Sequence, residues 1–227
     1  MTIPQSPSGP IDSIDSVYDM FLNGGVLMWP LLLCSILALA YIVERWIRLR
    51  DSELGSARYG QEILDALTAR GAGGALAKVS GEPRPLGRVL QPAFESLERN
   101  RLEREKAVED AGAREFTRLS AHLKPLVVIG ILAPLLGFLG TVFGMIECFA
   151  EISRSTGAIR PSDLASGISQ ALITTAAGLC IAIPTQAAYF WFKARIERFV
   201  RRAEDLYGEL TRSLDRTPLQ LPPGGPA

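Results

Sequence analysis

Three long stretches of the chain contain no charged residue, and they limit the possible folds more than any other feature of the sequence. They cover residues 20–43, 125–146 and 164–192, with lengths of 24, 22 and 29 residues. A helix rises about 1.5 Å per residue, so roughly 20 apolar residues cross the hydrocarbon core of a bilayer. Buried helices of soluble proteins rarely continue this far without a charge. The sequence therefore predicts an all-α membrane protein with three transmembrane helices.

The basic residues around these stretches predict how the chain is oriented. Lys and Arg are absent from residues 1–25, number 15 between Arg45 and Lys124, and number seven from Lys193 onward. Because basic loops stay in the cytoplasm, we expect a periplasmic N-terminus and a cytoplasmic C-terminus. The N-terminus lacks the basic segment of a signal peptide, so we expect the first span to be retained. The predicted segments are a periplasmic N-terminal segment (1–19), transmembrane helices at 20–43, 125–148 and 164–192, a cytoplasmic helical loop (44–124), a periplasmic loop (149–163), a cytoplasmic amphipathic helix (193–216) and a disordered tail (217–227).

The loop and the tail are both predicted to be helical extensions of the membrane spans. Residues 98–124 mix Glu and Arg at helical spacings, and apolar residues recur every three or four positions in 193–216. Neither segment has the patterning of an independent globular core. We expect these helices to continue the membrane helices and to pack against neighbouring subunits.

Several classes of function are not supported by the composition. The 24 basic and 24 acidic residues balance, which gives no reason to expect nucleic acid as a partner. The chain has no nucleophile–base set, no phosphate-binding loop and no Cys or His spacing typical of a metal site. We therefore predict no catalytic residues, no metal, no cofactor and no enzymatic activity. Cys34, Cys148 and Cys180 fall in or beside apolar runs and are expected to be packing residues.

Small residues form one stripe on each of the last two spans. At about 100° per residue, Gly137, Thr141, Gly144 and Cys148 share one face of the second span, with Gly140 beside them. Small residues let membrane helices approach closely. We expect helix packing through the five glycines of the two stripes, which are Gly137, Gly140, Gly144, Gly167 and Gly178. The stripe on the third span also includes Ala171, Thr174 and Thr185.

Polar side chains lie beside these stripes and are harder to explain by packing alone. A Thr hydroxyl can bond to a backbone carbonyl one turn back, but the amide of Gln170 needs several partners. Intramembrane polar groups tend to face a bundle interior or a wet cavity. We therefore infer a central lumen, which one chain with three spans is too small to enclose, and so an oligomer. Glu147 is either a proton acceptor at the outer mouth or the solvated end of its span, and we favour the solvated end.

Two long motifs give the chain a family resemblance. LLGFLGTVFGMIECF (135–149), followed by GISQALITTAAGLCIAIPT (167–185), resembles the paired signature of the MotA/TolQ/ExbB proton-channel family, and its TolQ/ExbB branch most closely. The resemblance implies a homopentamer in the bacterial inner membrane around two copies of a single-pass subunit of the ExbD/TolR type. That partner carries a membrane-embedded aspartate that takes up and releases protons. A TonB/TolA-like transducer and membrane lipids are further expected partners.

The resemblance also implies roles for single residues. Thr141 and Thr175 match two threonines that face the pore, and a family glutamate aligns with Gln170, which cannot titrate. On the helical wheel alone Thr174 is better centred than Thr175, so we keep both as candidates for the lining. The implied function is a stator subunit that converts proton flow into mechanical work on an envelope or outer-membrane system. The alternative is a non-conducting scaffold that holds a multi-subunit membrane complex together, and the presence of an aspartate-bearing partner would discriminate the two.

Overall fold

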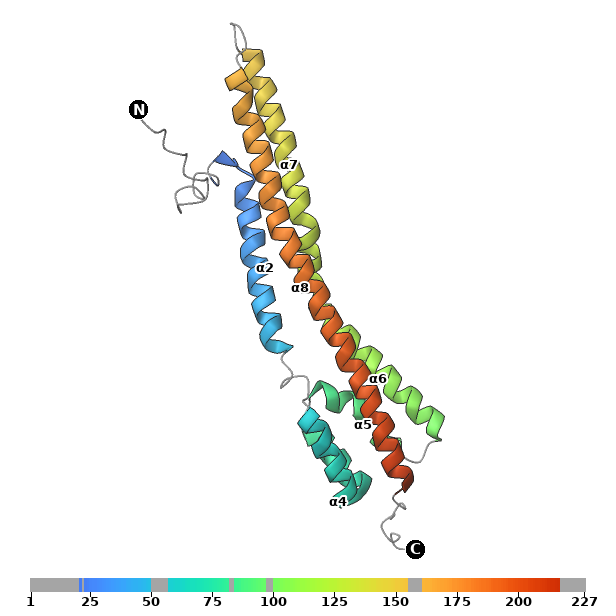
Figure 1. Cartoon of the computed structure of the whole chain (residues 1–227). Helices are drawn as coiled ribbons and strands as arrows, with labels where there is room; N and C mark the ends of the chain where they lie inside the picture. The colour runs from blue at the N-terminus through green and yellow to red at the C-terminus, as the bar shows by residue number, and fades with distance from the viewer. Residues whose placement is uncertain are drawn as a thin grey trace, which may run out of the picture. The chain divides into compact units, whose positions relative to one another are not determined.

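A computed structural model describes residues 21, 23–49, 57–81, 84–96, 100–154 and 161–216, and these residues contain helices and turns but no strand. The helices are α2 (Met28–Arg48), α4 (Ala57–Gly81), α5 (Pro85–Glu95), α6 (Arg101–Ala121), α7 (Lys124–Arg154) and α8 (Pro161–Arg216) (Figure 1). The predicted N-terminal segment and the predicted disordered tail lie outside the described residues.

Three of these helices are long and apolar enough to cross a membrane. The qualifying stretches are Met28–Arg48, Lys124–Arg154 and Ala165–Arg212. Each of the three predicted spans overlaps one of them. The all-α fold with three candidate membrane helices is therefore confirmed over the described residues.

The helices on either side of the predicted loop 149–163 extend further into it than the sequence indicated. Helix α7 continues to Arg154, and α8 already begins at Pro161. No Gly or Pro interrupts 149–154, and proline is well tolerated in the first turn of a helix because its missing N–H has no partner there. The two helices therefore include every residue of the predicted loop except 155–160, which lie outside the described residues.

The chain divides into two compact units. The first unit comprises residues 1–42 and 125–188, and it holds most of α2 and α7 and the N-terminal half of α8. Met28 and Leu31 of α2 form one buried cluster with Ala133 of α7 and Ala182 of α8. The partly buried residues packed against this cluster are Phe21, Leu136, Ile173, Ala177 and Ile181. Helix α2 thus covers one side of the α7–α8 pair.

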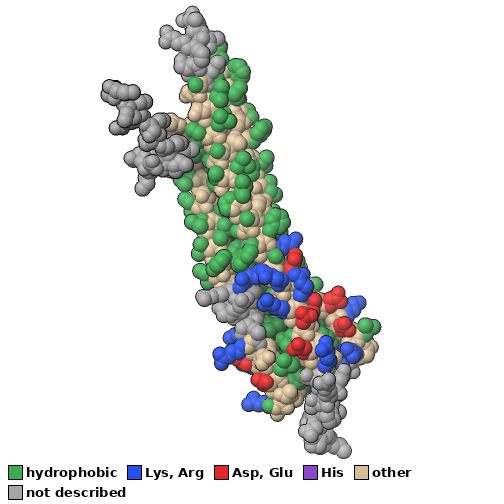
Figure 2. All heavy atoms as spheres, in the orientation of Figure 1, with side chains coloured by type: hydrophobic (Ala, Val, Ile, Leu, Met, Phe, Trp, Pro, Cys, Tyr) green, Lys and Arg blue, Asp and Glu red, His purple; other side chains and the backbone are tan. Residues whose placement is uncertain are grey.

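The outer surface of the first unit is strongly apolar. Phe138 is 66% exposed and Ile183 is 67% exposed, and many other large apolar side chains are similarly open. Figure 2 shows apolar side chains over most of the visible surface of this unit. Contiguous apolar surface of this kind is typical of contact with lipid or with another protein.

The second unit, residues 43–124 and 189–227, has a core of its own. Val89 of α5, Val108 of α6 and Ile196 of α8 are buried. A methyl group added at Gly112 of α6 would lie 3.3 Å from Val200 of α8 and 3.9 Å from Val89. The sequence predicts no independent core in the loop or the tail and packing of their helices against neighbouring subunits, but in this unit the two segments pack against each other. The core forms because the loop 44–124 and the C-terminal part of α8 each contribute an apolar face. Neither segment alone has enough apolar positions to predict a core.

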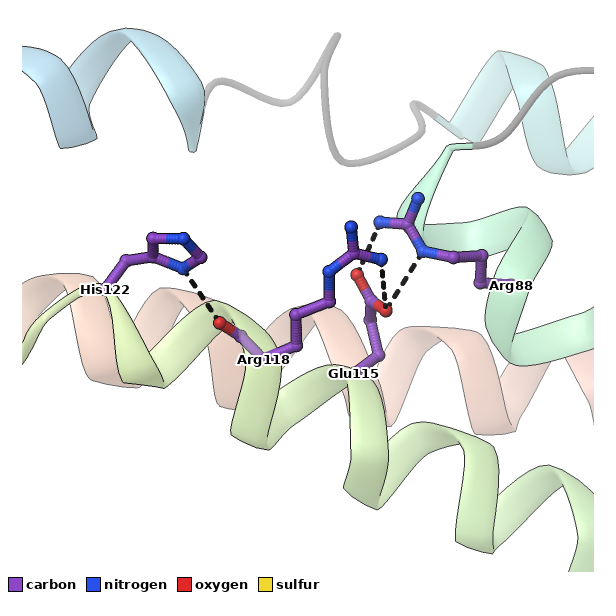
Figure 3. A network of polar contacts seen from close by, with 4 residues as sticks. All are labelled: Arg88, Glu115, Arg118 and His122. Carbon is purple, nitrogen blue, oxygen red and sulfur yellow. Dashed lines mark hydrogen bonds and ion pairs between the residues drawn. The ribbon is translucent and has the colours of Figure 1, made fainter.

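A buried ion pair joins α5 to α6 in this unit (Figure 3). Glu115 is 5% exposed, and its carboxylate accepts hydrogen bonds from Nε and Nη2 of Arg88 at 3.0 and 2.6 Å. Arg118 lies 3.9 Å from the same carboxylate, and the Arg118 carbonyl oxygen is 2.9 Å from Nδ1 of His122. A buried carboxylate is tolerated only when it is paired in this way, so the cluster has a structural role.

A second ion pair lies at the surface of α4. The Lys78 ammonium is 3.0 Å from the Glu62 carboxylate. The hydrogen bond from Lys78, together with the charge of Lys78, lowers the pKa of the Glu62 carboxyl. Because this carboxyl is open to solvent, the pair adds little to stability.

Candidate functional site

The two stripes of small residues meet along a seam between α7 and α8. A methyl group added at Gly178 would lie 2.6 Å from the Ala133 carbonyl oxygen, and one at Gly144 would lie 2.8 Å from the Gly167 carbonyl oxygen. These are backbone atoms, which cannot move aside unless the helices separate. The seam therefore requires glycine at these positions, and the five glycines named from the sequence all lie in it.

The threonines of the seam differ in what their hydroxyls contact. Thr174 is 1% exposed, lies against Gly140 and donates to carbonyl oxygens of its own helix at 3.0 and 3.1 Å. Thr175 is half-buried and donates to the Gly137 carbonyl oxygen of α7 at 3.2 Å, and also to Ala171 at 3.2 Å. The Thr175 hydroxyl thus bridges the two helices, whereas the Thr174 hydroxyl does not.

Helix α2 defines which side of the α7–α8 pair these hydroxyls occupy. A methyl group added at Gly24, just before α2, would lie 3.3 Å from Ile173 of α8, and Leu136 of α7 packs against the buried cluster that includes Met28 and Leu31 of α2. At about 100° per residue, Thr141 lies about 140° around α7 from Leu136, and Thr175 lies about 160° around α8 from Ile173. Thr141 is half-buried, and its hydroxyl donates to the Phe138 carbonyl oxygen at 2.6 Å. Both hydroxyls therefore lie on the side of the pair that faces away from α2.

Gln170 lies on the other side of the seam. Its side chain occupies the space next to Gly25, which has a φ of 71° and stands just before α2. The sequence grouped Gln170 with the threonines because both flank the same stripe of α8. A helical wheel of α8 alone cannot show which side of the stripe packs against α2. In the structure, the Gln170 side chain lies next to Gly25, in the turn before α2.

Glu147 is exposed on the last part of α7, near the end of the span. Sequence reasoning did not single out Gln186, whose side chain packs over Gly130 of α7. The signal that could have identified it is an amide inside the uncharged run 164–192. Within the described residues no group of three or more His, Cys, Asp or Glu could hold a metal ion.

The seam falls inside a region that matches a known family. The profile of the MotA/TolQ/ExbB proton channel family matches residues 82–205, more than half of the chain, including all of α7 and most of α8. The chain belongs to this family. The resemblance carried by the two motifs in 135–149 and 167–185 is therefore confirmed.

Named relatives place the chain in the TolQ/ExbB branch. It is 31% identical over 177 residues to biopolymer transport protein exbB1 of Vibrio cholerae, covering 77% of this chain and 78% of the relative. It is 40% identical over 174 residues to an ExbB-like biopolymer transport protein of Synechocystis, covering 73% of this chain and 66% of the relative. It is 38% identical over 97 residues to the Tol-Pal system protein TolQ of Pseudomonas aeruginosa, covering 43% of this chain and 42% of the relative.

The family and the apolar helices together establish a coarse description. The chain is a multi-pass membrane subunit of the ExbB/TolQ type, from a proton-channel family of energy-transducing systems. This is a transport-associated family and not a family of enzymes.

Proposed function

We propose that this chain is the stator and channel subunit of a motor driven by the proton-motive force in the bacterial inner membrane. Five copies surround two copies of an ExbD/TolR-like single-pass subunit, and α7 and α8 line the central path. The observation that carries this proposal is that the hydroxyls of Thr141 and Thr175 share the side of the α7–α8 pair away from α2. In such a ring α2 lies outside and the hydroxyls face the centre.

The spans supply hydroxyls and amides but no mid-membrane carboxylate, amine, guanidinium or imidazole that could carry a proton near neutral pH. Residues 20–43, 125–146 and 164–192 contain no Asp, Glu, Lys, Arg or His. A transmembrane proton path needs a titrating group or a continuous water wire. The proton carrier is therefore an aspartate of the partner subunit, and a TonB/TolA-like transducer passes the resulting motion to the envelope or outer membrane.

The proposed orientation puts the N-terminus in the periplasm and the C-terminus in the cytoplasm. It follows from the basic residues that flank the cytoplasmic ends of the spans. The rings of Trp46 and Trp191 are stacked with their centroids 5.1 Å apart. This pair supports a membrane–water boundary near these two residues, because amphipathic rings favour that boundary. The Arg195 guanidinium lies 5.3 Å from the Trp191 ring centre.

The alternative is a membrane scaffold without conduction. It is supported by the fact that the hydroxyls of Thr174 and Thr175 are already bonded to backbone carbonyls within one chain. In that case the seam would only hold helices together. A scaffold has no need for a partner with an aspartate in its membrane span.

Native mass spectrometry of the complex, extracted from its own membranes by a tag on this chain, tests the proposal. We expect five copies of the 24.6 kDa chain with two copies of a small single-pass protein whose span contains an aspartate. A monomer, a dimer or any assembly without such a partner would favour the scaffold.

A further inference from the structure

Gln186 is a polar side chain in the third span whose role is not explained by contacts among the described residues. It is half-buried, and a methyl group added at Gly130 of α7 would lie 2.7 Å from its Nε2 atom. The described parts of the chain give this amide no hydrogen-bond partner. An amide has two donors and an acceptor oxygen, and leaving them unpaired in hydrocarbon is unfavourable. The partner of Gln186 is therefore not among the described residues.

Gln186 lies on the same line of α8 as Thr175. The two are 11 residues apart, which places them about 20° apart around the helix and about 16 Å apart along it. Each lies over a glycine of α7, because Thr175 donates to the Gly137 carbonyl oxygen and Gln186 packs over Gly130. Gln186 therefore shares the side of the α7–α8 pair that faces away from α2, whereas Gln170 does not.

We propose that Gln186 is a second polar residue of the lining and binds water in the C-terminal part of the third span. This inference rests on the proposed channel function. A neutral amide both donates and accepts hydrogen bonds, so it can hold a chain of water molecules without storing a proton. The stretch between the two polar residues has the exposed Leu179 on the same line, so Gln186 hydrates a section of the path that is otherwise apolar.

Water accessibility of position 186 tests the placement directly. In a background with Cys34, Cys148 and Cys180 replaced by Ala, Gln186→Cys is treated with a charged methanethiosulfonate reagent in the assembled complex in membranes. Leu39→Cys is the control, because Leu39 is 64% exposed on α2, which lies on the other side of the pair. We expect Gln186→Cys to react at least about ten-fold faster, since the reactive thiolate forms in water and is suppressed in apolar surroundings. Equal, slow reaction at both positions would overturn the proposal.

Proton flux through reconstituted complexes distinguishes a failure of the proposed Gln186 role from a failure of the channel function. We expect Gln186→Leu to lower the flux by about ten-fold, which corresponds to about 1.4 kcal/mol in the barrier, and Gln186→Asn to restore part of it. Full flux in Gln186→Leu, with flux lost in Thr175→Val, would make the inference wrong and leave the channel function standing. Full flux in both variants would instead count against the channel function itself.

Discussion

Thr175→Val will reduce proton flux through the reconstituted complex to the level of empty vesicles, while the complex still assembles. Valine keeps the branched shape of threonine and removes the hydroxyl that donates to the Gly137 carbonyl oxygen at 3.2 Å. A lost hydrogen bond of this kind costs about 1 kcal/mol of stability, too little to dissociate the helices. The proton path, in contrast, loses the polar group on which its hydration depends. The measurement is proton uptake by proteoliposomes, with native mass spectrometry as the check on assembly.

Two matched variants sharpen this prediction. Thr175→Ser keeps the hydroxyl and should keep the flux. Thr174→Val removes a buried hydroxyl that bonds only carbonyls of its own helix among the described residues, and it should also keep the flux. If Thr174→Val abolishes flux and Thr175→Val does not, the lining residue is Thr174. If neither variant loses flux, neither threonine lines the path.

Gly178→Leu will separate α7 from α8 and prevent assembly of the complex. Even the first side-chain atom would lie 2.6 Å from the Ala133 carbonyl oxygen and 3.2 Å from the Gly137 Cα. Both contacts are with backbone, so the helices must move apart, and we expect a loss of about 3 kcal/mol or more. The measurement is the thermal stability and the oligomeric mass of the purified protein in detergent.

The control is another glycine of the same helix. Gly208 lies in α8 with nothing within 4 Å of an added methyl group. Gly208→Ala should therefore leave assembly intact and raise helix stability by up to about 1 kcal/mol. An intact, wild-type-like assembly in Gly178→Leu would show that the seam is not needed to hold the subunit together.

The sequence was sufficient to predict the spans and the composition of the seam, because both depend on local patterns. A long run without charge predicts a membrane span, and the helical spacing of Gly137 and Gly144 predicts a packing face on that helix. Which flank of that face α2 covers depends on contacts between distant segments. The position of Gln170 beside Gly25 follows from such a contact, 145 residues away in the chain, and no periodicity within α8 could have shown it.

The second unit could be predicted only in part, for a similar physical reason. Mixed charges at helical spacing predicted ion pairs within helices, and Arg58 with Glu62 is one of these. The buried pair of Arg88 with Glu115 instead joins two helices. The core of this unit combines the loop with the end of α8, as the contacts of Gly60 with Leu206 and of Gly112 with Val200 show. Each segment contributes an incomplete apolar face, so neither predicts a core when it is considered alone.

Proton flux measured with and without the partner subunit tests the proposed channel function most directly. Proteoliposomes would contain this chain alone, the complete complex, or the complex in which the membrane aspartate of the partner is replaced by Asn. With a membrane potential applied, we predict proton uptake by the complete complex and none by the other two preparations. A complete complex that takes up no more protons than empty vesicles would contradict the channel function and leave a structural role in the membrane.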